Sequence, residues 1–487
     1  MANLKITEKI IILSVSAAAI ISVIITQLAG LNPYVSSWDQ VDFSLAMDRY
    51  DLRAMQPHFP GYPYFILGGM LSRAFVGEPH QALLLFNVLI YASSIIPLFL
   101  LARRLLPSVT AILAAAAVYT SSYTLIIVNQ PMSEGAALAI VWWFIWSIVS
   151  ADERGVGIWT WLPLFLFSIL LGIRLSYIPM GIGLVFLFYR KWKEEEIDIA
   201  GLVKYVLIAA AFQSIWVGAL ILTEGGFMNF IELALGFTGG HFQEWGGTAS
   251  SNGMPFFERI NALLFINIFW WGIFSRSGFL MVIYIFVGML LLVSRKNRIE
   301  GKKTVFRLAA TLMVSYAIWA LFAQNVEKAR HVLPIVLLIV FMAVTALLQW
   351  NRNRLGILLV AVLICAQSVV SAGYIKAQAG EEPAVYQLAH FLGRQDVPSV
   401  LYTWEETRVL EYLESPFSHK RVYTYDVFLQ DKSLYKDREI FLTGSVVKGF
   451  EAQGYNVTAN IKKVKTFHSR EIFDPVYHEI ILYKWIP

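Results

Sequence analysis

Long apolar runs recur along the chain from residue 7 to residue 372, and most are close to the length that crosses a bilayer. A membrane-spanning helix needs about 20 mostly apolar residues, because its backbone polar groups must be satisfied within the helix. Soluble chains are about 25% charged, whereas this chain is 57% hydrophobic and only 15% charged. The sequence therefore predicts a polytopic α-helical membrane protein.

The composition changes after residue 373. We predict a transmembrane domain over residues 1–373 and a small α/β domain over residues 374–487, whose composition is that of a soluble domain. Alternating apolar residues predict strands at 399–403, 421–425, 439–443, 457–464 and 479–483, with helical character over 405–414.

Eleven segments are candidate membrane spans: 10–28, 82–102, 108–127, 134–150, 158–172, 175–189, 202–222, 278–294, 306–323, 331–349 and 355–373. Lys and Arg residues in short loops mark the cytoplasmic side. The basic loops are at 103–104, 190–193, 295–307 and 352–354. With these loops in the cytoplasm, the N-terminus lies inside and the C-terminal domain lies outside, in the plasma or inner membrane of a cell.

One further apolar segment, 259–273, does not fit this count, because a full crossing there would move the basic loop 295–307 outside. We interpret it as an interfacial or re-entrant segment on the outer side. The short spans 158–172 and 175–189 are expected to form a bent pair that meets near Arg174.

The remaining general features exclude other classes. The first run, 10–28, follows Lys5 and Lys9 and could be a signal peptide, but no small-residue cleavage site follows it, so we expect a retained helix. The single cysteine, Cys365, allows no disulfide framework. The net charge of +5 is explained by the basic loops. No basic stripe interleaved with aromatic residues and no phosphate-cradling glycine motif is found, so no nucleic-acid partner is expected.

Polar and ionisable residues collect at the outer ends of the apolar segments. Such groups are costly at membrane depth and usually functional. Carboxylates can act as general bases, and the guanidinium fork of arginine suits phosphate. The pattern predicts a reaction on a lipid phosphate at the outer leaflet. The candidate residues are Asp39, Asp42, His58, Tyr62, Glu134, Arg174, Arg330 and His331.

Simpler explanations stay open for most of these residues. Glu134 could cap the helix that follows it, and Arg174 could form a structural ion pair at a bend. Asp42 could be a solvated loop charge, and His58 could shape a turn between prolines. Arg330 and His331 could be interface anchors.

Two stretches of the first outer loop resemble a known family. WDQVDFSLAMDRYDL at 38–52, followed by PHFPGYPYF at 57–65, is similar to the corresponding loop of the GT-C superfamily of membrane glycosyltransferases. The resemblance is strongest to the branch of protein O-mannosyltransferases and lipid A aminoarabinose transferases, which is glycosyltransferase family 39-like. Asp39 matches the catalytic aspartate of that branch, Gln40 replaces its glutamate, and Phe43 matches its aromatic residue. The segments 131–134, 172–174 and 330–334 resemble further elements of such enzymes.

The resemblance implies an inverting, mannosyltransferase-like transfer of a hexosyl or pentosyl group from a polyprenyl-phosphate donor. The acceptor would be a glycan, a lipid or a protein of the cell envelope at the outer face. Asp39 would be the general base, with Asp42 and Glu134 as further catalytic candidates. Substrate would be bound by His58, Tyr62, Arg174, Arg330 and His331, with the two arginines on the lipid phosphate. No cofactor is required, although Asp39 and Glu134 could bind a divalent cation.

Two other classes remain as alternatives. A flippase or transporter of lipid-linked saccharides would also place polar groups in its bundle, but transporters commonly show repeated halves, and no internal repeat is found here. A non-catalytic envelope scaffold would leave the charges at membrane depth unexplained. Replacement of Asp39 separates these classes, because only catalysis depends on that carboxylate.

Overall fold

The computed structural model describes residues 4–251, 253–294, 303–350 and 354–486. The basic residues Arg295, Lys296, Arg298, Lys302 and Arg352, which contribute to the predicted topology, lie outside these ranges.

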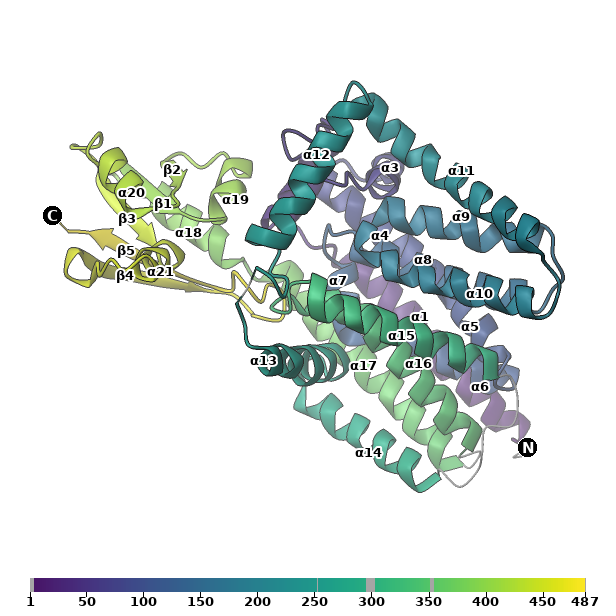
Figure 1. Ribbon diagram of the computed structural model, residues 1–487. Coiled ribbons are helices and arrows are strands. Elements are labelled where there is room, and N and C mark those ends of the chain that lie inside the picture. Colours follow the sequence, from purple (N-terminus) through teal and green to yellow (C-terminus); the bar gives the residue numbers. More distant parts are fainter. Residues whose placement is uncertain (1–3, 252, 295–302, 351–353, 487) are drawn as a thin grey trace.

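The membrane region is helical throughout, with short connections (Figure 1). Its elements are α1 (Ile6–Ala29), α2 (Trp38–Ala46), α3 (Pro63–Ser72), α4 (Pro79–Ser93), α5 (Ile95–Arg103), α6 (Ser108–Tyr119), α7 (Ser122–Val128), α8 (Glu134–Asp152), α9 (Ile158–Ile173), η1 (Leu175–Gly181), α10 (Ile182–Lys193), α11 (Ile199–Thr223), α12 (Phe227–Gly240), η2 (His241–Trp245), α13 (Phe256–Asn261), η3 (Ala262–Ile273), α14 (Gly278–Ser294), α15 (Lys303–Ala323), η4 (Ala329–Val332), α16 (Leu333–Trp350) and α17 (Arg354–Gly380).

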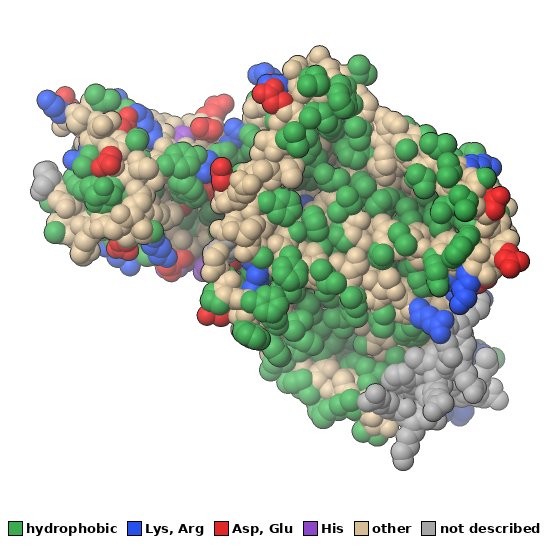
Figure 2. All heavy atoms as spheres, in the orientation of Figure 1, with side chains coloured by type: hydrophobic (Ala, Val, Ile, Leu, Met, Phe, Trp, Pro, Cys, Tyr) green, Lys and Arg blue, Asp and Glu red, His purple; other side chains and the backbone are tan. Residues whose placement is uncertain are grey.

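Burial separates the centre of the bundle from its periphery. In α8, 89% of the most apolar 18-residue window is buried, whereas the corresponding share in α11 is 11%. Because α11 is just as apolar in composition, its exposed leucine and valine side chains require a non-aqueous surrounding. Hydrophobic side chains cover the face of the bundle in Figure 2, and charged side chains gather at its ends and on the C-terminal region. This distribution is that of a membrane protein.

Each predicted span falls on one helix of the described chain or on two consecutive elements: 82–102 covers α4 and α5, 108–127 covers α6 and α7, and 175–189 covers η1 and α10. Seven helices are long and apolar enough to cross a membrane, or nine if each of two bent pairs is one span. The remaining predicted spans, 158–172 and 175–189, correspond to α9 and to η1 with α10, and α9 falls short of the length criterion. Eleven crossings therefore stay a prediction.

Two of the bends were predicted, but the break within the predicted span 108–127 was not: α6 and α7 are bent by 60° against each other. Helix α9 ends at Ile173, Arg174 is extended with φ −156° and ψ 102°, and η1 begins at Leu175. The segment 256–273 is bent by 107° against α14. This geometry fits a broken or re-entrant element and not a straight crossing.

The C-terminal region contains α18 (Ala384–Gly393), α19 (Glu406–Tyr412), α20 (Tyr425–Lys432) and α21 (Gly444–Ala452) around a mixed sheet. Its strands, in the order β2-β1-β3-β5-β4, are β1 (Ser399–Thr403), β2 (Ser418–Arg421), β3 (Glu439–Thr443), β4 (Ile461–His468) and β5 (Glu479–Trp485). Strand β1 pairs in parallel with β2 and β3, whereas β5 is antiparallel to β3 and β4.

Two of the predicted strands are shifted. The segment 421–425 ends a strand instead of forming one, because the Thr424 hydroxyl accepts from Val427 N and caps α20. Strand β4 begins at Ile461 and not at 457, because Thr458–Asn460 form a short 3₁₀ turn. Its lysines are tolerated because β4 is an edge strand. Helix α17 also continues through the predicted domain boundary at residue 373 to Gly380.

The two ends of the bundle differ. The sheet region lies beyond one end, and the N-terminus lies at the other (Figure 1). Helices α5 and α10, which end in Arg103 and Lys193, run to the end that carries the N-terminus. The described basic loops and the C-terminal region are therefore on opposite sides, as the predicted orientation requires.

This orientation can be tested with two cysteine variants in a Cys365→Ser background. Lys436→Cys lies in the C-terminal region and Lys193→Cys lies at the end of α10, and both side chains are exposed. We expect a membrane-impermeant maleimide to label residue 436 in intact cells and residue 193 only after permeabilisation. The reverse labelling pattern would contradict the predicted topology.

Candidate functional site

Asp39 sits in the first turn of α2, a helix that packs against α19 of the C-terminal region. Arg330, from η4, donates a hydrogen bond to Asp39 Oδ2 at 2.7 Å. Burial opposes ionisation of Asp39, but the positive charges of Lys328 and Arg330 outweigh it and hold the pKa of this carboxyl below its ordinary value. Asp39 is therefore charged and already engaged by a cation.

Arg330 also joins Asp39 to a second carboxylate. Its Nε lies 2.9 Å from Oε1 of Glu134, and Arg174 Nη2 approaches the same oxygen at 3.1 Å. Glu134 is the first residue of α8, and its side chain is only 1% exposed. Arg174 also donates to the hydroxyl of Ser133 at 3.0 Å. We define this set, Asp39, Arg330, Glu134 and Arg174, as the arginine–carboxylate network.

The position of Arg174 depends on the close approach of two helices. A Cβ atom at Gly172 would lie 2.4 Å from the ring of Tyr64, which belongs to α3. Glycine therefore allows α9 to pack against α3 and brings the extended residue Arg174 to the end of α8. In the sequence Gly172-Ile173-Arg174, the glycine thus allows the helix contact, and the arginine is placed by it.

Asp42, one turn after Asp39, belongs to a different network. Its side chain is fully buried, and Oδ2 lies 3.2 Å from His58 Nδ1. His58 Nε2 is 2.8 Å from the hydroxyl of Tyr62, and Phe43 packs edge-on against Tyr62. Burial raises the pKa of Asp42, although the hydrogen bond and charge of His58 act in the opposite direction.

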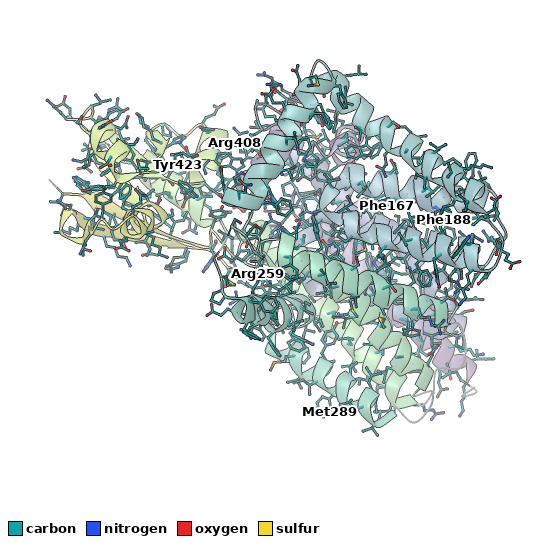
Figure 3. The ribbon with its side chains drawn as sticks, in the orientation of Figure 1. Phe167, Phe188, Arg259, Met289, Arg408 and Tyr423 are labelled. Carbon is teal, nitrogen blue, oxygen red and sulfur yellow. The ribbon has the colours of Figure 1, made fainter. Side chains whose placement is uncertain are left out.

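Asp42 is also the point where the C-terminal region attaches to the bundle. Arg408, on α19, donates from Nε to Asp42 Oδ1 at 3.0 Å and from Nη2 to the carbonyl oxygens of Ala54 and Met55. Figure 3 shows Arg408 at this junction. Asp42 is thus neither a solvated charge nor an open cavity residue. It is a buried anchor for an arginine 366 residues away.

One predicted residue, His331, falls outside both networks, and so does Gln40. His331 Nδ1 lies 3.1 Å from the carbonyl oxygen of Asn325, within its own loop. Gln40, which stands where the family has glutamate, accepts a hydrogen bond from Ser36 N at 2.9 Å and stabilises the entry to α2. The second carboxylate beside Asp39 is therefore Glu134 and not residue 40.

A cavity of about 490 Å³, open solvent included, lies beside Asp39 between the bundle and the C-terminal region. The bundle contributes Trp38, Asp39, Tyr123, Gln130, Lys328 and Arg330, and the C-terminal region contributes Glu405 and the segment 473–477.

Sequence reasoning missed the contribution of the C-terminal region. The candidate residues did not include Lys328, Glu405, Arg408 or Asp474. Glu405 and Arg408 lie in a polar helical segment that has the pattern of a solvated surface. Only their contacts with α2 and with the cavity distinguish them.

Asp39 and Glu134, which could bind a divalent cation, are bridged by the guanidinium of Arg330 in this structure. A cation could bind both carboxylates only if Arg330 moved away. Within the described ranges, no group of three His, Cys, Asp or Glu side chains is placed to hold a metal ion.

Comparison with known proteins identifies the fold. No protein-family model matches the chain, and no curated protein matches it in sequence. Among solved structures, ArnT from Cupriavidus metallidurans bound to undecaprenyl phosphate superposes with a TM-score of 0.56 at 10% identity, over 97% of each chain. Its apo state gives a TM-score of 0.55 at 9% identity, over 96% of this chain and 97% of that one.

The oligosaccharyltransferase of Archaeoglobus fulgidus in its apo form gives a TM-score of 0.51 at 11% identity, over 89% of this chain and 69% of that one. Both proteins are GT-C glycosyltransferases. The resemblance drawn from the first outer loop is therefore confirmed at the level of the fold: the chain is a polytopic helical membrane protein with the GT-C architecture.

The Asp42–Arg408 pair predicts a large effect on stability. Arg408→Ala leaves a fully buried carboxylate without its guanidinium, which costs roughly 3–5 kcal/mol when a buried ion pair is broken from one side. We expect a lower thermal unfolding temperature of the purified protein in nanodiscs. Arg438→Ala is the control, since Arg438 is exposed and bonds only the Ser418 hydroxyl among the described residues.

A double replacement tests the cause of this loss. Asp42→Asn in the Arg408→Ala background removes the uncompensated charge and should recover part of the unfolding temperature. If Arg408→Ala unfolds no earlier than Arg438→Ala, the anchoring role of the pair is wrong.

Proposed function

We propose that this protein is a membrane glycosyltransferase that moves a sugar from a polyprenyl-phosphate donor to an acceptor hydroxyl at the outer face of the membrane. The observation that carries this proposal is the arginine–carboxylate network beside the cavity. It combines a carboxylate suited to act as a base with two arginines suited to hold phosphate. The GT-C fold, and the undecaprenyl phosphate bound by ArnT, support a lipid-phosphate ligand.

A phosphate can reach the network through Arg330. Arg330 and Asp39 line the cavity, whereas Glu134 is already held by Arg330 and Arg174 at 2.9 and 3.1 Å. Lys328 also faces the cavity and forms no ion pair with any described residue. A phosphate would be held by Arg330 and Lys328, with Arg174 behind them.

In the proposed reaction Asp39 takes the proton of the acceptor hydroxyl. The acceptor oxygen attacks the anomeric carbon, the bond from that carbon to the phosphate oxygen breaks, and its electron pair leaves with the polyprenyl phosphate. Displacement from the opposite face inverts the configuration. The arginines stabilise the charge that develops on the leaving phosphate.

The same geometry implies that phosphate and Asp39 compete for Arg330. While Arg330 binds Asp39, the lowered pKa of this carboxyl makes it a weak base. A phosphate that draws Arg330 away would restore basicity to Asp39 when the donor is in place. We propose this coupling as the reason why the base and the phosphate ligand share one arginine.

Sugar transfer by the purified protein tests the proposed function. Undecaprenyl phosphate carrying radiolabelled glucose, mannose, galactose or a pentose would be offered with a membrane lipid extract as acceptor. We expect wild type to transfer label from one of these donors and Asp39→Asn to transfer at least about 100-fold more slowly, as is typical for loss of a general base.

Asp48→Asn is the matched control for the transfer assay. Asp48 lies in the same outer loop but pairs with Arg73 at the exposed surface. Equal rates in wild type and Asp39→Asn would move the base to another residue. If the protein moves a lipid-linked saccharide across the liposome membrane but transfers no sugar, the flippase alternative is favoured.

Binding of undecaprenyl phosphate gives a second prediction, in which Asp39→Asn strengthens binding although it slows transfer. Because Asp39 competes for Arg330, Asp39→Asn should bind undecaprenyl phosphate about fivefold more tightly, on the order of 1 kcal/mol. Arg330→Ala should bind it more weakly. Affinities would be measured by microscale thermophoresis in nanodiscs.

Asp48→Asn removes the same charge from the loop without freeing Arg330, so its affinity should stay near that of wild type. A weaker affinity in Asp39→Asn than in Asp48→Asn would overturn the competition between Asp39 and the phosphate.

A further inference from the structure

The loop between β4 and β5 leaves the sheet and enters the end of the bundle. Ile472 in this loop is only 5% exposed and belongs to the hydrophobic core of the membrane region. Gln130, before α8, donates from Nε2 to the carbonyl oxygen of Phe473 at 2.7 Å. Arg276 forms an ion pair with Glu471. The loop is therefore fixed by contacts with three parts of the bundle, and it forms one wall of the cavity.

Asp474 lines this cavity. Its Oδ1 accepts from the backbone nitrogens of Val476 at 3.3 Å and Tyr477 at 3.2 Å. No described residue donates a hydrogen bond to Oδ2. Burial raises the pKa of Asp474 to about 7, although Arg330 and Lys328 oppose this shift. A carboxyl group that is partly protonated near neutral pH can both donate and accept hydrogen bonds.

Glu405 is the second acidic residue on this wall. It immediately precedes α19 and lines the cavity beside Trp38. Within the described ranges its carboxylate takes part in no hydrogen bond or ion pair. Burial raises its pKa, while the charge of Lys328 acts in the opposite direction. Both acidic residues on the C-terminal wall thus have oxygen atoms available for a ligand.

The two walls differ in charge, which decides how a lipid-linked sugar can lie. Arg330 and Lys328 line the bundle side, whereas Glu405 and Asp474 line the C-terminal side. A phosphate would be repelled by the acidic wall and attracted to the basic one. Sugar hydroxyls both donate and accept hydrogen bonds, so they match the acidic wall. The rings of Trp38 and Tyr477 add apolar faces against which a sugar ring can pack.

We infer that Glu405 and Asp474 form a carbohydrate subsite, in which the C-terminal region binds hydroxyl groups of a sugar ring opposite Asp39. This inference rests on the proposed function. The same chemistry could serve the transferred sugar of the donor or a sugar of a glycan acceptor. In either case the two residues determine which sugar is accepted, because their positions fix which hydroxyls can be bonded.

Steady-state kinetics and lipid binding together test the subsite. Glu405→Gln and Asp474→Asn would be compared with wild type, using the radiolabelled donor that wild type transfers. Asn at position 474 keeps an Oδ1 that can accept from Val476 and Tyr477, so the turn is retained. We expect an at least tenfold rise in the KM of one substrate, with no change in the affinity for sugar-free undecaprenyl phosphate.

The two sources of the sugar give different results. A higher KM for the donor assigns the subsite to the transferred sugar, and a higher KM for the acceptor extract assigns it to an acceptor glycan. Asp426→Asn, an exposed carboxylate on α20 of the same region, is the control and should change neither value.

Two results would overturn the subsite. One is that neither KM changes in the variants. The other is that their affinity for undecaprenyl phosphate falls in parallel, which would assign the residues to the phosphate or to folding. If wild type transfers no sugar and binds no undecaprenyl phosphate, the proposed function itself fails, and that outcome is distinct from an unchanged KM in an active enzyme.

Discussion

Arg330 is the residue on which the arrangement of the candidate site depends. It binds Asp39 from α2 and Glu134 from α8, and Arg174 completes the set from the break after α9. Two carboxylates this close would repel each other in a low-dielectric setting, so each needs a guanidinium to remain charged. The same cation that stabilises the resting site is also the best candidate for a phosphate ligand. The stability of the site and the binding of a ligand therefore both depend on Arg330.

The C-terminal region is part of this site and not a separate appendage. Arg408 reaches down to the buried carboxylate of Asp42, and the β4–β5 loop places Ile472 in the core of the bundle. These contacts bring Glu405 and Asp474 to the cavity beside Asp39. A buried ion pair contributes little net stability, because burying the charges costs what their attraction returns. The Asp42–Arg408 pair instead fixes the position of the C-terminal region against the bundle.

Much of the helical architecture was predictable, because few backbone structures can cross a bilayer with their polar groups satisfied. The break at Arg174 and the bent segment before α14 were expected from segment length and charge. The shifted strands β2 and β4 were not, because Thr424 caps a helix and Thr458–Asn460 form a turn that short-range patterns do not reveal. Of the candidate residues, Asp39, Glu134, Arg174 and Arg330 do meet, whereas the hydrogen bond that His331 forms among the described residues is to its own loop.

The sequence by itself determined that the chain is a helical membrane protein whose unusual ionisable residues collect at the ends of its apolar segments. The reason is energetic: apolar length and the cost of charge at membrane depth can be read from local sequence. Only the tertiary structure decided which charges are partners. Asp39 meets Arg330 across 291 residues, and Asp42 meets Arg408 across 366 residues. No local pattern encodes such pairs, because they depend on how separate helices and the C-terminal sheet pack together.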